Sequence, residues 1–252
     1  MISVIAVDLD ETLLRNDGSV SPRSLAALAD WENAGHRAVI ATGRPPRSAR
    51  RIPEPLLHLP CVCYNGAAIY QNGTQSYAQT IAAPDARWIV ERLLAAGLSG
   101  WIGIEIDDVL YINQRSERWG HVYTPDLLTV AEQPAAKILL SMRDYLAAES
   151  TMKALPDSSK VLLSEKYDLA QIMPIQSSKA TALHHLMSEW GISMDHVAAF
   201  GDDVNDVEMV AEAGLGVAMD NAVDEVKAVA DRITASNDRD GVALVVEELL
   251  QR

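Results

Sequence analysis

Residues 2–14 read ISVIAVDLDETLL. The stretch begins with a short apolar run rich in Val and Ile, which is typical of a strand buried on both faces of a parallel sheet. The run ends at Asp8 and Asp10, and ligands of open α/β sheets bind beyond the carboxyl ends of the strands. Two carboxylates at that place can hold Mg²⁺, attack a phosphorus atom or transfer a proton. A purely structural role is the weaker interpretation, because neighbouring carboxylates at the end of an apolar strand repel each other unless they are paired.

The pattern of an apolar strand followed by polar residues recurs twice. Residues 37–41 (RAVIA) lead into Thr42, Gly43 and Arg44, and residues 197–200 (VAAF) lead into GDDVND at 201–206. Between them, Lys179 stands at the start of an expected helix. Each group also has an ordinary structural interpretation: a helix cap for Thr42, a surface position for Lys179, and a solvated acidic loop for Asp202, Asp203 and Asp206. Taken together with Asp8, they favour a single anion-binding site with a metal ion.

In these segments the chain resembles the phosphatases of the haloacid dehalogenase superfamily, and in particular the Cof-like branch with a type IIB cap. Four motifs in order carry the resemblance: DLDETLL at 8–14, TGR at 42–44, Lys179, and GDDVNDVEM at 201–209. Lesser hallmarks are YNGA at 64–67, VAMDNA at 217–222, and SN at 236–237 before DGV at 240–242. The resemblance covers both ends of the chain well and the middle poorly. The chain departs from the family at Glu11 and Asp220, where glycine is common.

The resemblance implies a role for each motif residue. Asp8 is the expected nucleophile, which forms an aspartyl-phosphate, and Asp10 is the general acid that protonates the leaving oxygen and then the base that activates water. The expected Mg²⁺ ligands are Asp8, Asp10 through its backbone carbonyl, Asp202, and Asp206 directly or through water. The expected phosphate-binding groups are Thr42, Gly43, Lys179 and Asn205. Arg44 binds substrate or braces the inserted domain, and Glu11 adds negative charge that could alter rate or preference.

The order of expected elements predicts two domains. Residues 1–83 and 175–252 alternate strand and helix, which predicts an α/β core with a doubly wound, mostly parallel, Rossmann-like sheet. Residues 84–174 have a mixed α+β pattern and predict an inserted cap domain over the carboxyl ends of the core strands. Within it we expect a helix over 86–96, a hairpin around Asp107 and Asp108, a strand over 137–142, a helix over 144–155 and a last strand pair over 161–164 and 168–173. Trp101, Trp119 and Tyr167 on this domain are candidates for selecting the leaving group.

The composition of the chain limits the classes of molecule that it is expected to bind. The chain has 252 residues, 48% of them hydrophobic, and a formal net charge of −14. That charge argues against nucleic acid or an anionic membrane as a partner, so an anionic substrate needs a local positive feature. Asp8 and Asp10 interrupt the apolar N-terminal run, so we expect no secretory signal and a cytoplasmic protein. Cys61 and Cys63 are expected to be core thiols, and the six histidines show no metal-ligand spacing.

The sequence therefore predicts a Mg²⁺-dependent phosphatase that hydrolyses small phosphomonoesters through an aspartyl-phosphate, with sugar phosphates favoured by the resemblance alone. One alternative is a phosphomutase or phosphotransferase, which passes the phosphate to an alcohol. Another is a non-catalytic phospho-aspartate signalling protein of the receiver type, against which the inserted region and Asp10 argue. A regulatory protein that keeps the pocket for ligand binding is a third. Neither the physiological substrate nor the oligomeric state follows from the sequence.

Overall fold

The computed structural model describes residues 1–115 and 120–251. The chain forms two compact units, Met1–Tyr77 with Ser178–Arg252, and Ala78–Ser177. The second unit is longer at both ends than the predicted range 84–174. Backbone contacts explain the difference: Ile81 forms a β-bridge with Ala135, and the Ile175 amide donates to the Ser158 carbonyl oxygen at 2.7 Å.

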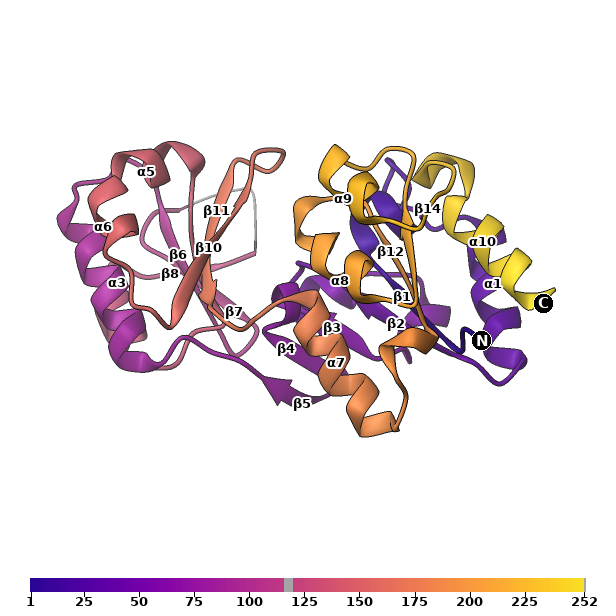
Figure 1. Ribbon diagram of the computed structural model, residues 1–252. Coiled ribbons are helices and arrows are strands. Elements are labelled where there is room, and N and C mark those ends of the chain that lie inside the picture. The colour runs from indigo at the N-terminus through magenta and orange to yellow at the C-terminus, as the bar shows by residue number, and fades with distance from the viewer. Residues whose placement is uncertain (116–119, 252) are drawn as a thin grey trace. The chain divides into compact units, whose positions relative to one another are not determined.

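The first unit is built on a sheet whose strands lie in the order β14-β13-β12-β1-β2-β3-β4-β5 (Figure 1). Strands β14 to β3 are parallel to their neighbours, whereas β4 pairs with β3 in antiparallel fashion. The strands are β1 (Val4–Val7), β2 (Arg37–Ala41), β3 (Cys61–Cys63), β4 (Ala68–Gln71), β5 (Thr74–Ala78), β12 (Val197–Gly201), β13 (Leu215–Ala218) and β14 (Arg232–Ile233).

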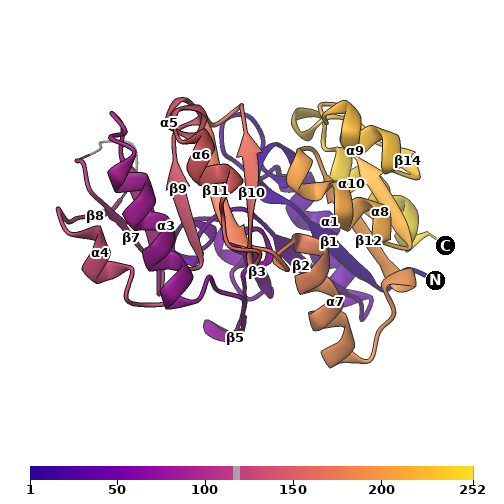
Figure 2. The same cartoon turned by 60° about the vertical axis from the view of Figure 1, so that its left-hand side comes forward.

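Helices cover both faces of this sheet, as the fully buried strand β1 requires. Ile5 and Val7 of β1 belong to a core that includes residues of α1 and α10, while Val4 and Ala6 belong to a core that includes residues of α7. Figures 1 and 2 both show α1 next to α10. The predicted doubly wound α/β fold is confirmed. The helices are α1 (Pro22–Asn33), α2 (Pro46–Ala49), α7 (Lys179–Trp190), α8 (Val207–Glu212), α9 (Asp224–Val229) and α10 (Gly241–Leu250).

The order of connections creates a switch point at β1. From β1 the chain moves to β2 and β3 on one side, and β12 to β14 return on the other side. The loops that leave β1 and β12 therefore diverge, and this divergence opens the crevice in which α/β sheets bind ligands.

The second unit is an α+β unit with its own sheet, in the order β10-β11-β9-β6-β7-β8. Its strands are β6 (Ile102–Ile106), β7 (Val109–Ile112), β8 (Val122–Tyr123), β9 (Lys137–Leu140), β10 (Ser159–Ser164) and β11 (Leu169–Pro174). Its helices are α3 (Ala83–Ala95), α4 (Leu127–Val130), α5 (Met142–Ala147) and α6 (Glu149–Lys153). Alternate strand residues such as Ile104, Ile138 and Ile172 form one apolar core with α3. Figures 1 and 2 show α3 and α6 on the same face of the sheet.

The second unit differs from its sequence prediction in detail. The single helix expected over 144–155 is two helices, because Ala148 between them has non-helical angles (φ −95°, ψ 25°). Strand β8 and helix α4 were not predicted, since both are short and their sequences are not strongly periodic. The expected hairpin turn at Asp107 and Asp108 is present, and both residues have positive φ. Trp119 lies outside the described residues.

Gly66 is a position where the fold demands glycine. Its φ is +94°, and a Cβ built there would lie 1.9 Å from the Ser178 carbonyl oxygen. Gly35, which follows α1, also has a positive φ (+87°), but nothing lies within 4 Å of the position that a Cβ would occupy there. We predict that Gly35→Ala costs only the strain of a left-handed residue, about 1–2 kcal/mol. Gly66→Ala should cost clearly more, because the start of α7 must also move.

Urea denaturation of the two variants and the parent checks this prediction. Equal destabilisation by the two substitutions would mean that the contact between Gly66 and Ser178 does not constrain the fold.

Candidate active site

The carboxyl ends of β1 and β12 bring two acidic residues together. The two strands pair in register with Val7 opposite Phe200, so Asp8 follows one strand where Gly201 and Asp202 extend the other. Asp8 is 5% exposed and Asp202 is 3% exposed. Two buried carboxylates so close together raise the electrostatic free energy of the folded state unless cations compensate them.

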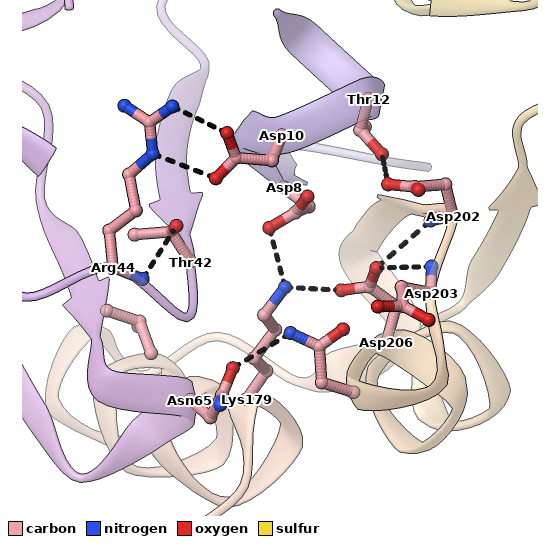
Figure 3. A network of polar contacts seen from close by, with 12 residues as sticks. Asp8, Asp10, Thr12, Thr42, Arg44, Asn65, Lys179, Asp202, Asp203 and Asp206 are labelled. Carbon is pink, nitrogen blue, oxygen red and sulfur yellow. Dashed lines mark hydrogen bonds and ion pairs between the residues drawn. The ribbon is translucent and has the colours of Figure 1, made fainter. Parts of the chain in front are cut away.

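Lys179 provides one compensating charge. Its Nζ donates to Asp8 Oδ1 at 2.6 Å and to Asp206 Oδ1 at 2.5 Å (Figure 3). The ammonium group is buried because Lys179 is the first residue of α7, which Ser178 caps by accepting from the Thr181 amide. Asp206 is held in turn by the amides of Asp202 and Asp203, which donate to its Oδ2 at 3.0 and 3.1 Å.

The pKa shifts follow from this geometry. Burial raises the pKa of the Asp8 carboxyl well above its ordinary value; Lys179 opposes that shift, while Asp206 and Asp202 add to it. Burial by itself would lower the pKa of the Lys179 ammonium, but the carboxylates of Asp206 and Asp8 more than reverse this effect and raise it. Lys179 is therefore positively charged at neutral pH, and a further cation near Asp8 would favour the ionised carboxylate.

Three carboxylates of this site fit a metal ion. Asp8, Asp202 and Asp206 each offer an oxygen, and these oxygens all lie within 4.8 Å of one another. A buried set made only of carboxylate oxygens suits a hard divalent cation such as Mg²⁺. The Asp10 carboxylate is not part of this set, and the expected contribution of its backbone carbonyl stays a prediction.

The segment between Asp8 and Leu14 forms a tight loop. The Leu13 amide donates to the Asp8 carbonyl oxygen at 3.2 Å, and the Leu14 amide donates to the Leu9 carbonyl oxygen at 2.7 Å. Glu11, inside the loop, has φ +58° and ψ 12°, in the left-handed region. This conformation favours glycine, because a residue with a Cβ raises the free energy of the folded state by about 1–2 kcal/mol there.

Thr12 binds this loop to the segment that follows β12, and no sequence motif predicted a role for it. Its Oγ1 donates to Asp202 Oδ1 at 2.8 Å, and the residue is 1% exposed. The sequence alone could not predict this hydrogen bond, because it does not show which strand lies next to the loop. Thr12 thus orients one carboxylate of the candidate metal site.

Arg44 contacts Asp10 in a bidentate ion pair. Its Nε donates to Asp10 Oδ2 at 2.8 Å and its Nη2 donates to Asp10 Oδ1 at 2.5 Å, as Figure 3 shows. The Arg44 amide donates to Thr42 Oγ1 at 3.1 Å, and Thr42 is fully buried. Arg44, which was predicted to bind substrate or to brace the inserted domain, therefore pairs with the expected acid and base, and the hydroxyl predicted to bind phosphate accepts from its backbone amide.

Asn65 joins the site from the YNGA hallmark, which the motif analysis noted without assigning a role. Its Oδ1 accepts from Asn205 Nδ2 at 2.8 Å, and a Cβ on Gly43 would lie 2.7 Å from the same oxygen. Asn65 has a positive φ of 54°, which asparagine tolerates better than most residues. Among the described residues, the buried Asn205 Oδ1 has no hydrogen-bond partner.

The whole arrangement belongs to a known class of protein. A family model of the haloacid dehalogenase-like hydrolases matches residues 5–246, so the chain belongs to that family. The resemblance inferred from the four motifs is confirmed, and with it the predicted enzyme class, a hydrolase of the phosphatase type.

Two curated relatives that match nearly the whole chain are named as phosphatases. It is 28% identical over 261 residues to the 5-amino-6-(5-phospho-D-ribitylamino)uracil phosphatase YitU of Bacillus subtilis (strain 168), covering 97% of this chain and 96% of that protein. It is 29% identical over 261 residues to the pyridoxal phosphate phosphatase YbhA of Escherichia coli (strain K12), covering 95% and 96%.

Solved structures agree with the fold. The crystal structure of TM0651 from Thermotoga maritima aligns with a TM-score of 0.86 at 28% identity, covering 98% of this chain and 97% of that chain. The subclass IIB sugar phosphatase BT4131 aligns with a TM-score of 0.83 over 98% of both chains, and at 19% identity it supports the fold alone. Within the described residues, no helix is both long enough and apolar enough to span a membrane.

The charge network generates a stability prediction for the metal-free protein. Lys179→Met leaves the carboxylates of Asp8 and Asp206 buried without their shared cation, so the free energy of unfolding should fall by about 3–5 kcal/mol. The matched control is Lys153→Met, which removes an ion pair with Glu149 whose side chains are 74% and 71% exposed. The control should change stability by no more than about 0.5 kcal/mol.

Chemical denaturation in EDTA measures both variants against the parent. If Lys179→Met proves as mild as Lys153→Met, Lys179 does not compensate the buried carboxylates.

Proposed function

We propose that the protein is a Mg²⁺-dependent phosphatase that hydrolyses small phosphomonoesters through a phosphorylated Asp8. The observation that carries the proposal is the placement of the Asp8 carboxylate. It is buried, and the described hydrogen bonds engage only its Oδ1, with Lys179, which leaves Oδ2 for attack. The acidic cluster and the Asp10–Arg44 pair, which come from adjacent loops, supply the other groups that phosphoryl transfer needs.

In the first step, an Asp8 oxygen attacks phosphorus and the bond from phosphorus to the leaving oxygen breaks. Asp10 donates a proton to that oxygen, so the product leaves as a neutral alcohol. Lys179, the Thr42 hydroxyl, the Gly43 amide and Asn205 are proposed to bind the phosphoryl oxygens. Arg44 donates to both Asp10 oxygens in the structure, so Asp10 must release one of these hydrogen bonds when it carries the proton.

In the second step, Asp10 accepts a proton from water, the water oxygen attacks phosphorus, and the bond between phosphorus and Asp8 breaks. Inorganic phosphate then leaves and Asp8 is free again. Asp8, Asp202 and Asp206, with the Asp10 carbonyl, are the groups that would hold Mg²⁺, which when bound neutralises negative charge on the carboxylates and the phosphoryl group.

Substrate choice is proposed to reside in the inserted unit, which would act as a cap. The core groups named above bind the phosphoryl group, which all phosphomonoesters share. Relatives named for phosphatase action on a ribityl phosphate and on pyridoxal phosphate support small phosphorylated metabolites as the substrate class. Sugar phosphates are the first group to test.

A panel of phosphorylated metabolites, assayed for phosphate release with and without Mg²⁺, tests the proposal. The panel contains sugar phosphates, pyridoxal 5′-phosphate and para-nitrophenyl phosphate. Mg²⁺-dependent release from several members is the expected result. A phosphorylated protein that persists without release would instead favour a signalling role, and transfer to an added alcohol would favour a phosphotransferase.

Asp8→Asn should lower turnover by more than about a thousandfold, because the amide has nearly the same shape but is a poor nucleophile. Asp10→Asn should slow turnover and allow the phosphorylated protein to accumulate with para-nitrophenyl phosphate, whose leaving group needs no proton. Trapping of ³²P on acid-quenched protein measures the accumulation. Near-normal turnover by a clean preparation of Asp8→Asn would exclude the covalent mechanism.

Mg²⁺ should stabilise the fold more strongly as pH rises. Burial raises the pKa of Asp8, so protonation of Asp8 stabilises the folded state at low pH, and this contribution disappears as pH rises through the raised pKa. Because Mg²⁺ binds the ionised form and competes with that proton, the rise in Tm should be larger near about pH 8 than near about pH 5. When Mg²⁺ is in hundredfold excess over its Kd, its binding should raise the free energy of unfolding by about 2.7 kcal/mol.

Two variants make this measurement specific. Asp202→Ala removes a proposed ligand and should weaken the response to Mg²⁺. Asp203→Ala removes a neighbouring carboxylate that accepts from the Val204 amide and should keep the full response. An unchanged Mg²⁺ response in Asp202→Ala would remove Asp202 from the metal site.

A further inference from the structure

Two asparagines from the C-terminal part of the chain bind the loop that carries Asp10. Asn221 Nδ2 donates to the Glu11 carbonyl oxygen at 2.8 Å. Asn237 Nδ2 donates to the Leu14 carbonyl oxygen at 3.0 Å. The two side chains therefore hold the loop at its middle and at its end.

The two asparagines are also linked to each other. Asn221 Oδ1 accepts from the backbone N–H of Asn237 at 3.1 Å, and Asn237 is only 5% exposed. Each belongs to a hallmark that the sequence analysis noted without a role, VAMDNA at 217–222 and SN at 236–237. The bonds run from side chain to backbone, so they depend on asparagine at these positions and not on the partner side chains.

The loop needs such support because Glu11 is in a conformation that favours glycine. Its φ of +58° lies in the left-handed region, and Asp10, the preceding residue, has extended angles (φ −71°, ψ 122°). Because Thr12 and Leu14 are fixed by hydrogen bonds to Asp202 and Asn237, a change of Glu11 to a negative φ would have to be accommodated on its other side, at Asp10. A hydrogen bond to the Glu11 carbonyl oxygen resists that change.

The segment with Asn221 also binds the other half of the site. The Val223 amide donates to the Asp202 carbonyl oxygen at 2.8 Å, and the Met219 amide donates to the Gly201 carbonyl oxygen at 3.1 Å. The same short segment therefore contacts the backbone on both sides of the acidic cluster, at Glu11 and at Asp202.

We propose that Asn221 and Asn237 are positioning residues for the hydrolytic reaction: they hold the strained Glu11 backbone and thereby fix the Asp10 carboxylate where it can transfer a proton. The inference rests on the proposed role of Asp10. It adds that the left-handed conformation of Glu11 is maintained from outside the loop by the Asn221 side chain, which Asn237 holds through its backbone amide while its own side chain fixes the end of the loop at Leu14.

The test is a double-mutant cycle between Asn221 and Glu11. Asn221→Ala should lower kcat/KM for pyridoxal 5′-phosphate about tenfold, since a misplaced general acid loses part of its contribution. The loss for para-nitrophenyl phosphate should be less than about threefold, because that leaving group needs little protonation. Asn237→Ala should show the same dependence on the leaving group. A general loosening of the fold would lower kcat/KM for both substrates by the same factor.

Rescue by glycine separates backbone strain from other causes. Glycine adopts a positive φ without a steric cost, so Glu11→Gly in the Asn221→Ala background should restore most of the lost activity. Glu11→Ala in the same background removes the same carboxylate but keeps the Cβ, and it should not restore activity. If Asn221→Ala alone fails to fold, the double variant with Glu11→Gly should fold and the double variant with Glu11→Ala should not.

Arg239→Gln is the control for the surrounding loops. Arg239 pairs with Asp220 and donates to Ser236, so its loss disturbs the same two segments without removing either bond to the Asp10 loop. Arg239→Gln should leave the ratio of the kcat/KM values for the two substrates unchanged.

The outcomes distinguish this inference from the proposed function. If Asp10→Asn slows turnover but Asn221→Ala affects both substrates equally, or if Glu11→Gly and Glu11→Ala behave alike, the positioning role is wrong. If the parent protein releases no phosphate, the proposed function is wrong, which is a different result from the loss of leaving-group dependence that contradicts the positioning role alone.

Discussion

The buried contact of Lys179 with Asp8 and Asp206 is the interaction on which the rest of the site depends. Three carboxylates and one ammonium group lie in a space with almost no solvent exposure, where unpaired charge is costly. Lys179 compensates part of that charge, and a hard cation would compensate more. The same surplus of negative charge suits the Mg²⁺ that we propose for this site, and through that metal ion the proposed binding of a phosphoryl group.

The topology of the sheet makes this concentration of charge possible. Strands β1 and β12 are far apart in sequence but adjacent and parallel, so their carboxyl ends present Asp8 and Asp202 at the same edge. The first turn of α7 adds Lys179 to that edge. Asp8, Lys179 and Asp202 come from three distant parts of the sequence, so only the tertiary fold brings them together.

The loop after β1 solves a different problem, which is to direct Asp10 away from the metal-binding oxygens. Asp10 lies two residues from Asp8, yet its carboxylate pairs with Arg44 and not with Lys179. The extended angles of Asp8 and Asp10 and the ion pair with Arg44 go with this separation, and Thr12 and Asn221 anchor the turn that follows. The two neighbouring carboxylates are thus divided between two proposed roles.

The sequence by itself determined the α/β alternation and the family, because apolar periodicity and short motifs are local properties of the chain. The same motifs predicted Asp8, Lys179, Asp202 and Asp206 as candidate site residues, and the structure brings these four side chains together. Only the tertiary structure decided that Arg44 pairs with Asp10, that Thr12 binds Asp202, and that Asn65 and Asn221 support the site. It also decided the break at Ala148 and the start of the inserted unit at Ala78. These features arise from hydrogen bonds and packing between segments far apart in sequence, which local patterns do not encode.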